Sequence, residues 1–222
     1  GMNSGGDARI EIFDADGDGD LDVLMGNSTN KLYFNDGAGS FSVATNAIDS
    51  SGLAVGDIDG NNYVDMVEGC NGSVAIHAND GLGNFVLSAP SISNVNAVDL
   101  GDIDRDGDLD LLIVRDSGTK INNLYLNNGS GTFTAIGTNP FDGIADVSVD
   151  GRFEDLNGDG YQDIIIFNSA SQNYLYMNDG DSTFTKSNAF GASHNTYQVV
   201  TLDADGDGDI DVINGRPDES SR

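Results

Sequence analysis

The chain has 222 residues and a mass of 23.2 kDa, and its 37 Asp and Glu outnumber nine Lys and Arg, which leaves a formal net charge of −28. This balance excludes nucleic acid and anionic membrane surfaces as partners, because both are bound through basic patches. The single Cys70 excludes an internal disulfide framework and a cysteine-based zinc site, and no apolar run reaches the roughly 18 residues that would predict membrane insertion.

Short β-type segments follow one another along the chain, separated by turns rich in Gly, Asn and Asp. Residues 1–6 precede the first segment, and Gly1 before Met2 indicates a tag remnant or linker. No segment shows the period of about 3.6 residues that is typical of a helix. The expected strands are 8–13, 22–26, 31–35 and 41–45; 53–56, 65–69, 75–79 and 85–89; 97–101, 110–114, 124–128 and 133–137; 148–154, 163–167, 174–178 and 184–188; 197–202 and 211–215.

Two motifs recur along this series of segments. Acidic nonapeptides such as DADGDGDLD begin at intervals of 43, 45, 53 and 48 residues, and a Gly-rich turn such as NDGAGSF follows four of them. The nonapeptides begin at Asp14, Asp57, Asp102, Asp155 and Asp203. A repeat of about 47 residues that carries four short strands is typical of a propeller blade.

The sequence therefore predicts an all-β protein, a β-propeller of four-stranded antiparallel blades that forms one domain over residues 7–216, with a polar tail at 217–222. The expected blades are 7–49, 50–95, 96–145 and 146–195, followed by a half blade at 196–216. About four and a half blades leave an open edge, which a soluble protein must cover. We expect the chain to be part of a longer propeller, such as a seven-bladed one, with a complete small propeller and closure through another chain, as in a homo-oligomer, as the alternatives.

The first acidic loop has the composition of a calcium site. Asp14, Asp16, Asp18 and Asp22 alternate along a tightly curled chain, and the backbone carbonyl of Asp20 adds a fifth oxygen. The sixth residue is a glycine, which permits the positive φ of the sharp turn. Hard oxygen ligands without His or Cys select Ca²⁺ over zinc or copper. The alternative interpretation is a set of solvated acidic turns that hold no metal.

The loops differ from EF-hands, which need a Glu at position twelve and a following helix. Only the second loop has an acid there, Glu68, and the flanking segments are β-type. The loops resemble instead the FG-GAP or VCBS repeats of integrin α-subunit propellers and secreted microbial proteins, both in the nonapeptide and in the downstream LYFNDGAGSF and LYLNNGSGTF. This resemblance implies a β-propeller whose Ca²⁺ loops join the first and second strands of each blade.

The resemblance also implies up to five Ca²⁺ ions, each held by the same five positions of its loop. The further expected ligand sets are Asp57, Asp59, Asn61, Asp65 and the Tyr63 carbonyl; Asp102, Asp104, Asp106, Asp110 and the Asp108 carbonyl; Asp155, Asn157, Asp159, Asp163 and the Tyr161 carbonyl; Asp203, Asp205, Asp207, Asp211 and the Asp209 carbonyl. The second loop has Asn62 where the family has glycine and carries fewer acids, so we expect it to bind most weakly.

The five equivalent copies of the acidic loop argue against an enzyme. A glycoside hydrolase, for example, needs a single pair of carboxylates, and the two lie in unequal environments. Motifs for a nucleophile elbow, a phosphate loop or an HExxH metal site do not occur. We expect a non-catalytic, secreted or surface-displayed module in which Ca²⁺ is structural and whose partner is an extracellular protein, so that it acts in adhesion or protein binding. One alternative is a Ca²⁺-dependent lectin, which the absence of Trp disfavours; another is an accessory domain of a larger secreted enzyme or adhesin.

Other residues that could carry chemistry have plainer interpretations. His77 falls in a third-strand column that Tyr occupies in the other blades, which predicts a packing role. His194 lies in a polar turn and is expected to be exposed, and Cys70 is expected to be an inert, half-buried thiol. The aromatic residue after each Gly-rich turn is expected to pack between blades. These residues are Phe41, Phe85, Phe133 and Phe184.

Overall fold

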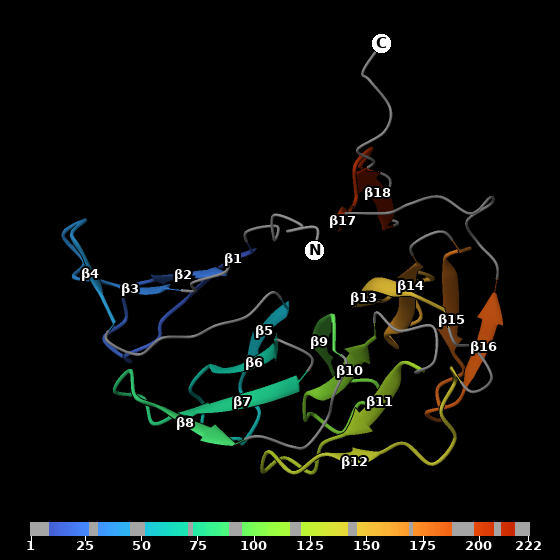
Figure 1. Cartoon of the computed structure of the whole chain (residues 1–222), viewed down its shortest axis with the longest axis horizontal. Helices are drawn as coiled ribbons and strands as arrows, with labels where there is room; N and C mark the ends of the chain where they lie inside the picture. Colours follow the sequence, from blue (N-terminus) through green and yellow to red (C-terminus); the bar gives the residue numbers. More distant parts are fainter. Residues whose placement is uncertain are drawn as a thin grey trace. The chain divides into compact units, whose positions relative to one another are not determined.

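The computed structural model describes residues 9–26, 31–44, 52–70, 73–88, 95–115, 121–141, 146–168, 171–187, 198–206 and 210–215. Within these residues the chain forms strands β1 to β18 and no helix, which confirms the predicted all-β fold (Figure 1). In the same part of the chain, the structure has no helix of the length and hydropathy needed to cross a membrane. The strands form four antiparallel four-stranded sheets and one two-stranded sheet, as expected for four and a half propeller blades.

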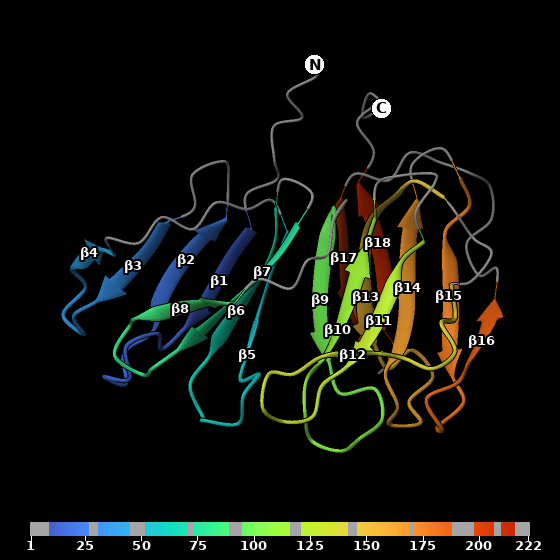
Figure 2. The same ribbon diagram turned by 60° about the horizontal axis from the view of Figure 1, so that its bottom comes forward.

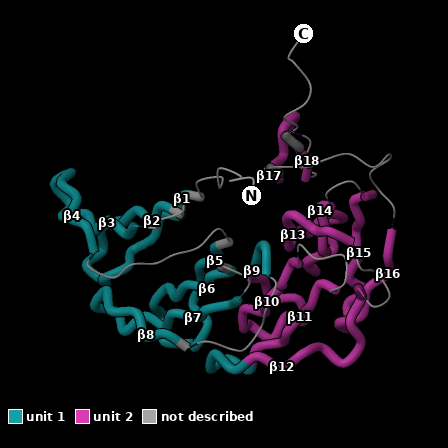
Figure 3. Tube along the Cα trace, in the orientation of Figure 1, with its two compact units in different colours: residues 1–98, 128–132 teal, residues 99–127, 133–222 magenta. Residues whose placement is uncertain are grey.

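The chain divides into two compact units, which Figure 3 shows in different colours. Unit 1 comprises residues 1–98 and 128–132, and it contains two of the four-stranded sheets. The strands of its first sheet are β1 (Arg9–Phe13), β2 (Asp22–Gly26), β3 (Lys31–Asn35) and β4 (Phe41–Val43). Those of its second sheet are β5 (Gly52–Gly56), β6 (Asp65–Cys70), β7 (Ser73–Asn79) and β8 (Phe85–Ser88).

Apolar side chains hold the two sheets of unit 1 face to face. One buried cluster takes Leu24 and Leu32 from the first sheet and Leu53 and Met66 from the second. Met66 and Leu24 are 0% exposed, and Phe85 of β8 packs against the same cluster. Removal of apolar surface from water is the main force in folding, so this cluster holds the two sheets together. The acidic loops, which join the strands at their ends, are thereby held in place.

Unit 2 comprises residues 99–127 and 133–222 and contains the remaining three sheets, with β9 crossing the boundary between the units. Its strands are β9 (Ala97–Gly101), β10 (Asp110–Val114), β11 (Asn123–Leu126), β12 (Thr134–Ala135), β13 (Ser148–Glu154), β14 (Asp163–Asn168), β15 (Tyr174–Asn178), β16 (Phe184–Ser187), β17 (Gln198–Leu202) and β18 (Asp211–Gly215). Every residue of β10 and β14 is buried. Phe167 of β14 lies in a buried cluster against which Val212 of β18 packs.

Each four-stranded sheet is a meander of antiparallel strands, so the first and third connections lie at the same end of the strands. These are the acidic loop between the first and second strands and the Gly-rich turn between the third and fourth strands (Figure 2). In the first sheet this brings the acidic loop 14–22 next to the Gly-rich turn that follows Asn35. The repeated pairing of the two sequence motifs therefore has a direct structural reason.

The observed strands agree with the sequence prediction to within a few residues, and the shortest is β12, with two residues. One expectation about the core is wrong. Phe41 is 52% exposed, whereas the equivalent Phe85 packs between the two sheets of unit 1. The difference arises within unit 1, where the first sheet packs on the Phe85 face of the second sheet and no described sheet of this unit packs on the Phe41 face of the first. The domain limits 1–6, 7–216 and 217–222 stay predictions, and their outermost segments lie outside the described residues.

Candidate metal centre

The ninth residue of each acidic loop is an Asp that closes the loop. Asp22 is 0% exposed, and its Oδ2 accepts a hydrogen bond from the backbone N–H of Ala15 at 2.8 Å. Its Oδ1 accepts a second one from the backbone N–H of Asn35 at 2.8 Å. The same pair of bonds recurs at Asp65, Asp110 and Asp163. The ninth carboxylate thus joins the start of the acidic loop to the end of the third strand through one side chain.

The first residue of the loop organises its tip. Asp14 Oδ1 accepts from the backbone N–H of Gly17 at 2.8 Å, and Asp14 Oδ2 accepts from that of Gly19 at 3.0 Å. These bonds curl the chain around the first carboxylate, in the manner of repeated Asx turns. The curl requires positive φ values, which are 76° at Gly17 and 92° at Gly19.

The expected positive φ at the sixth loop position is confirmed, also where the residue is not glycine. Asn62 has a φ of 68°, in the left-handed region that Asn tolerates better than most residues. The fourth position has the same conformation, which was not predicted from the sequence. In the third loop the fourth residue is Arg105, with a φ of 62°. Its guanidinium lies over the Tyr161 ring at 4.8 Å from the centroid, in the neighbouring loop of unit 2.

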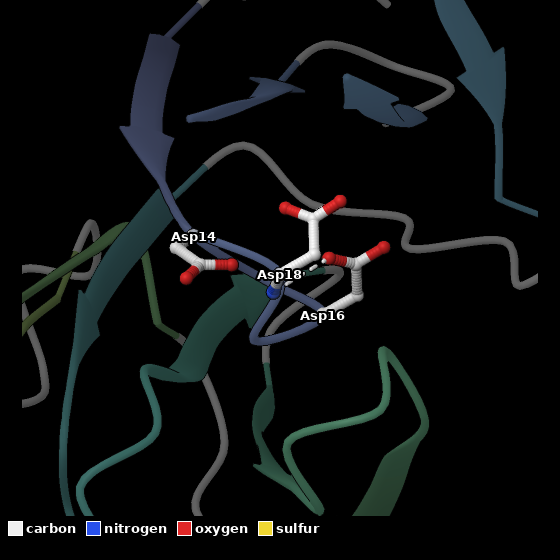
Figure 4. A group of neighbouring side chains, drawn as sticks. All are labelled: Asp14, Asp16 and Asp18. Carbon is white, nitrogen blue, oxygen red and sulfur yellow. Dashed lines mark hydrogen bonds between the residues drawn. The ribbon is translucent and has the colours of Figure 1, made fainter. Parts of the chain in front are cut away.

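Four of the five loops bring three of the expected carboxylates together. In each group the potential ligand oxygens all lie within 4.8 Å of one another. The first group contains Asp14, Asp16 and Asp18, whose side chains rise from one curled loop in Figure 4. The others are Asp57, Asp59 and Asp65; Asp102, Asp104 and Asp110; Asp203, Asp205 and Asp211.

Some expected ligands lie outside these groups. Asp22 is not in the first group, and Asp106 is not in the third. The Asn61 side chain is hydrogen-bonded elsewhere: its Oδ1 accepts from the Tyr63 N–H at 2.7 Å and its Nδ2 donates to the Asn79 carbonyl at 2.9 Å. The described residues of the fourth loop form no such group, since Asn157 replaces an acid and donates from Nδ2 to Asp159. Two of the expected ligands of the fifth loop, Asp207 and Asp209, lie outside the described residues. The carbonyl ligands at Asp20, Tyr63, Asp108 and Tyr161 stay predictions.

The clustered acids repel one another and are partly removed from water. Burial raises the pKa of Asp110 to about 7, and the charges of Asp104 and Asp106 act in the same direction, against two backbone hydrogen bonds that lower it. Burial also raises the pKa of Asp16, helped by the charges of Asp18 and Asp22. In the third loop, Asp102 Oδ1 is buried and has no hydrogen-bond partner among the described residues. A cation would satisfy this oxygen and relieve the repulsion.

The donor set of the loops therefore fits a hard divalent cation. The expected ligand positions offer carboxylate, amide and backbone oxygens, the nonapeptides contain no His or Cys, and Ca²⁺ takes six to eight oxygens in flexible geometry. Mg²⁺ would have to lose most of its tightly held waters in a loop this rich in carboxylates. In the second loop the predicted ligand Asn61 is hydrogen-bonded through both side-chain polar atoms, and the weaker binding of this loop stays a prediction.

The Asn that begins the Gly-rich turn links neighbouring loops in the second and fourth of these turns, a role that was not predicted from the sequence. Asn79 Nδ2 donates to the Val64 carbonyl of its own loop at 3.1 Å and to the Ala15 carbonyl of the preceding loop at 2.9 Å. In unit 2, Asn178 Nδ2 makes the equivalent bond to the Ile103 carbonyl at 2.8 Å. The recurrence of this Asn in all four Gly-rich turns was the available signal.

The seventh residue of the loop also has a packing role. A Cβ atom placed at Gly81 would lie 2.3 Å from Cζ of Tyr63, and one at Gly37 would lie 2.3 Å from Oδ2 of Asp20. The glycine of the turn therefore leaves room for the seventh side chain of the adjacent loop. The sequence alone predicted only a backbone carbonyl ligand at this position.

Of the other residues singled out by sequence, His77 is more than a packing residue. Its Nε2 lies 2.8 Å from Oε2 of Glu68, which is 3% exposed, so the pair forms a polar contact within the sheet β5–β8. His194 and the side chain of Cys70 lie outside the described residues.

Comparison with known proteins agrees with this architecture. The family model described as FG-GAP-like repeat matches four times, at residues 14–68, 57–113, 102–166 and 155–213. No curated protein sequence matches the chain. Among solved structures, the chain is similar to a lectin of Agrocybe aegerita described as recognising non-reducing terminal N-acetylglucosamine, with a TM-score of 0.63 and 22% identity. The similarity covers 94% of this chain and 60% of the lectin chain.

Proposed function

The chain belongs to the FG-GAP-like repeat family, and from this premise we propose that it is a non-catalytic binding module of the β-propeller type, stabilised by Ca²⁺ in its acidic loops. We place the module outside the cell or on its surface, where it acts in adhesion or protein binding. The proposed partner is an extracellular protein that contacts the variable loops, because these loops change between repeats while the acidic loops do not.

The proposal that the loops bind Ca²⁺ rests on one observation, the convergence of carboxylates in four of them. Groups of three acids within 4.8 Å recur in four loops, each with the first and third loop residues and either the fifth or the ninth, and Asp102 contributes a buried oxygen without a partner among the described residues. Like charges at such distances are destabilising, and a bound cation would offset this repulsion.

The expected affinity fits an extracellular setting. Extracellular Ca²⁺ modules bind at roughly 10⁻⁴ to 10⁻³ M. At free Ca²⁺ about tenfold above Kd, each ion adds about 1.4 kcal/mol of stability, and five ions add about 7 kcal/mol. This sum is comparable to the net stability of a whole domain, about 5–15 kcal/mol. Calcium at these loops is therefore structural.

The equivalence of the loops supports a binding module rather than an enzyme. Each ninth Asp accepts the same hydrogen bond from the backbone N–H of the second residue of its loop, so the loops repeat one arrangement instead of forming a single unequal pair of acids. General acid–base chemistry needs two carboxylates with different pKa values at one place.

A carbohydrate partner is the second candidate, and the similarity to a lectin favours it. At 22% identity this similarity supports the fold, and the ligand has to be tested separately. The lectin candidate predicts retention of the chain on immobilised N-acetylglucosamine in Ca²⁺ and release by a chelator.

The deciding experiment measures binding of the labelled chain to intact cells in Ca²⁺, after the cells are treated with protease or with glycosidases. The proposed protein-binding function predicts that protease removes binding and that glycosidases leave it unchanged. The opposite pattern, together with retention on N-acetylglucosamine, would establish the lectin. Turnover of a glycoside that depends on one unrepeated acid would contradict both.

A further inference from the structure

In unit 2, one basic side chain reaches from the third acidic loop to the fourth. Arg105 is the fourth residue of the third loop, and its guanidinium lies over the ring of Tyr161, the seventh residue of the fourth loop, at 4.8 Å from the centroid. A Cβ atom placed at Gly160 would lie 3.4 Å from Nη1 of Arg105. Arg105 holds this place with a φ of 62°, which L side chains rarely adopt. A backbone conformation of this kind persists where the surrounding contacts hold it, so the guanidinium and the ring fit each other well.

The same two loop positions meet in unit 1, but without an arginine. Gly17 is the fourth residue of the first loop, and Tyr63 is the seventh residue of the second. A Cβ atom placed at Gly17 would lie 3.5 Å from Cε1 of Tyr63, so the fourth position is again next to the ring. Gly17 has no side chain that could cover the ring, and Tyr63 is 40% exposed. The equivalent Tyr161, which lies under Arg105, is half-buried.

The neighbours of the Tyr63 ring all belong to unit 1. The first loop lies on one side of the second loop, and the turn at Gly81 lies against the ring itself. On the other side of the second loop lies the third Gly-rich turn, where the Gly131 N–H donates to the Ile58 carbonyl at 3.1 Å. These loops and turns are all described, so the open side of the ring arises within one unit and between two complete loops.

The charges around the two rings differ by the one arginine. The first and second loops contain five and three Asp and no base, and the third and fourth loops contain five and three Asp together with Arg105. One Ca²⁺ in each of the first two loops would still leave four negative charges beside Tyr63. A cation is therefore attracted to this ring. Asn62 stands where the fourth loop has Gly160, and its amide oxygen can accept a hydrogen bond from an N–H of that cation.

We propose that the Tyr63 ring and the two acidic loops beside it bind a guanidinium group, supplied by an arginine side chain of the partner protein. Arginine fits better than lysine because its planar group stacks on an aromatic face and keeps its N–H donors for carboxylates. The occupant follows from the ring in unit 2, which the chain covers with its own arginine, and from the negative charge around Tyr63. This site adds a contact to those of the variable loops, and it rests on the proposed function for the partner alone.

The site is tested without the partner by NMR of isotope-labelled tyrosine rings in saturating Ca²⁺. The probe is N-acetyl-arginine amide, and its neutral isostere N-acetyl-citrulline amide is the matched control. We expect a saturable shift of the Tyr63 ring resonances with the arginine probe only, and no response of the Tyr161 ring, which Arg105 covers. Tyr63→Leu removes the responding resonances and thereby assigns them.

Arg105→Gly is the variant that separates this site from general attraction to acids. It gives the third loop the glycine that the other four loops carry at this position and suits the positive φ, so the variant is expected to fold. Because it uncovers Tyr161, both rings should now shift, and the number of bound probes should double from one to two. Val86→Ala, at a side chain of β8 that is 66% exposed, is expected to titrate like wild type.

The outcomes distinguish the site from the proposed function. A Tyr63 ring that does not respond, equal shifts with the arginine and citrulline probes, or an unchanged number of bound probes in Arg105→Gly would overturn the site. A shift with N-acetylglucosamine but not with the arginine probe would overturn it in favour of a sugar. The comparison of probes on wild type needs no variant to fold, and the melting temperature reports folding of each variant.

The assay on intact cells tests the assignment to a partner. Tyr63→Leu is expected to lose most of the protease-sensitive binding, and unchanged binding by this variant would overturn the partner arginine. Failure of the probe titration with intact cell binding by wild type would overturn the site and leave the proposed function standing. Absence of cell binding by wild type would count against the proposed function instead.

Discussion

Asn79 Nδ2 lies 2.9 Å from the backbone carbonyl oxygen of Ala15, although 64 residues separate them. Asn79 is 2% exposed, and its Oδ1 also accepts from the Gly81 N–H at 3.0 Å. One side chain therefore joins the Gly-rich turn of the second sheet to the acidic loop of the first. This relationship explains why the two sequence motifs recur together.

We predict that Asn79→Ala lowers the free energy of unfolding by about 2–4 kcal/mol, because it leaves buried backbone groups without partners. Asn35→Ala is the matched variant, since Asn35 Nδ2 reaches only the Leu21 carbonyl among the described residues. It should cost about 1 kcal/mol. Urea denaturation in Ca²⁺ measures both. Equal losses in the two variants would contradict the linking role of Asn79.

We predict that Asp102→Asn has opposite effects with and without Ca²⁺. Without the ion, loss of one negative charge relieves repulsion around a buried oxygen that lacks a described partner, so the melting temperature rises. With the ion, the chain binds one Ca²⁺ fewer and melts earlier than wild type. Asp36→Asn is the control, because exposed Asp36 accepts from backbone N–H groups in the Gly-rich turn, outside the acid groups. It should leave the Ca²⁺ count unchanged.

The pH dependence of stability should reverse when Ca²⁺ is added. The pKa of Asp110 is about 7 in the metal-free fold and 3.8 ordinarily, so folding favours its protonated form. Its contribution is fully present below pH 3.8 and is lost as the pH rises through 7, so metal-free protein should be more stable at pH 5 than at pH 7. With Ca²⁺, protons compete with the ion, and stability should fall between pH 7 and pH 5.

Urea midpoints at the two pH values, with Ca²⁺ and with chelator, measure this reversal. Asp110→Asn removes the titrating group and should flatten the metal-free dependence. A metal-free midpoint that rises from pH 5 to pH 7 in wild type would contradict the assignment.

Two glycines with positive φ should respond differently to alanine. Gly39 has a φ of 88° and no atom within 4 Å of an added Cβ, so Gly39→Ala should cost only the backbone strain, about 1–2 kcal/mol. At Gly81, with a φ of 74°, an added Cβ would also meet the Tyr63 ring at 2.3 Å. Gly81→Ala should therefore lose more free energy of unfolding, and the double variant Tyr63→Ala with Gly81→Ala should recover part of it. Equal losses at Gly39 and Gly81 would show that the seventh loop side chain does not pack on the turn.

Much of the fold could be predicted from sequence because its signals are local. The nonapeptide spacing and the β-type segments predict the strands to within a few residues, since turn chemistry fixes where each strand ends. The positive φ at Asn62 follows from its place in the loop. Convergence of the acids in four loops was likewise expected from the alternating pattern.

The remaining features depend on contacts between distant segments. The bond from Asn79 to Ala15 and the contact between Glu68 and His77 require sheet register, which the repeat alone does not specify. The exposure of Phe41 depends on whether a sheet covers its face, although Phe85 occupies the same repeat position. Sequence periodicity assigned both residues the same environment for this reason.

Calcium binding to the metal-stripped chain tests the central claim most directly. Isothermal titration at pH 7, with the melting temperature followed in parallel, counts the ions and reports their effect on the fold. The account predicts saturable binding of up to five Ca²⁺, a marked rise in melting temperature, and little response to Mg²⁺. A melting temperature that is the same in millimolar Ca²⁺ and in chelator, with no measurable Ca²⁺ uptake, would contradict it.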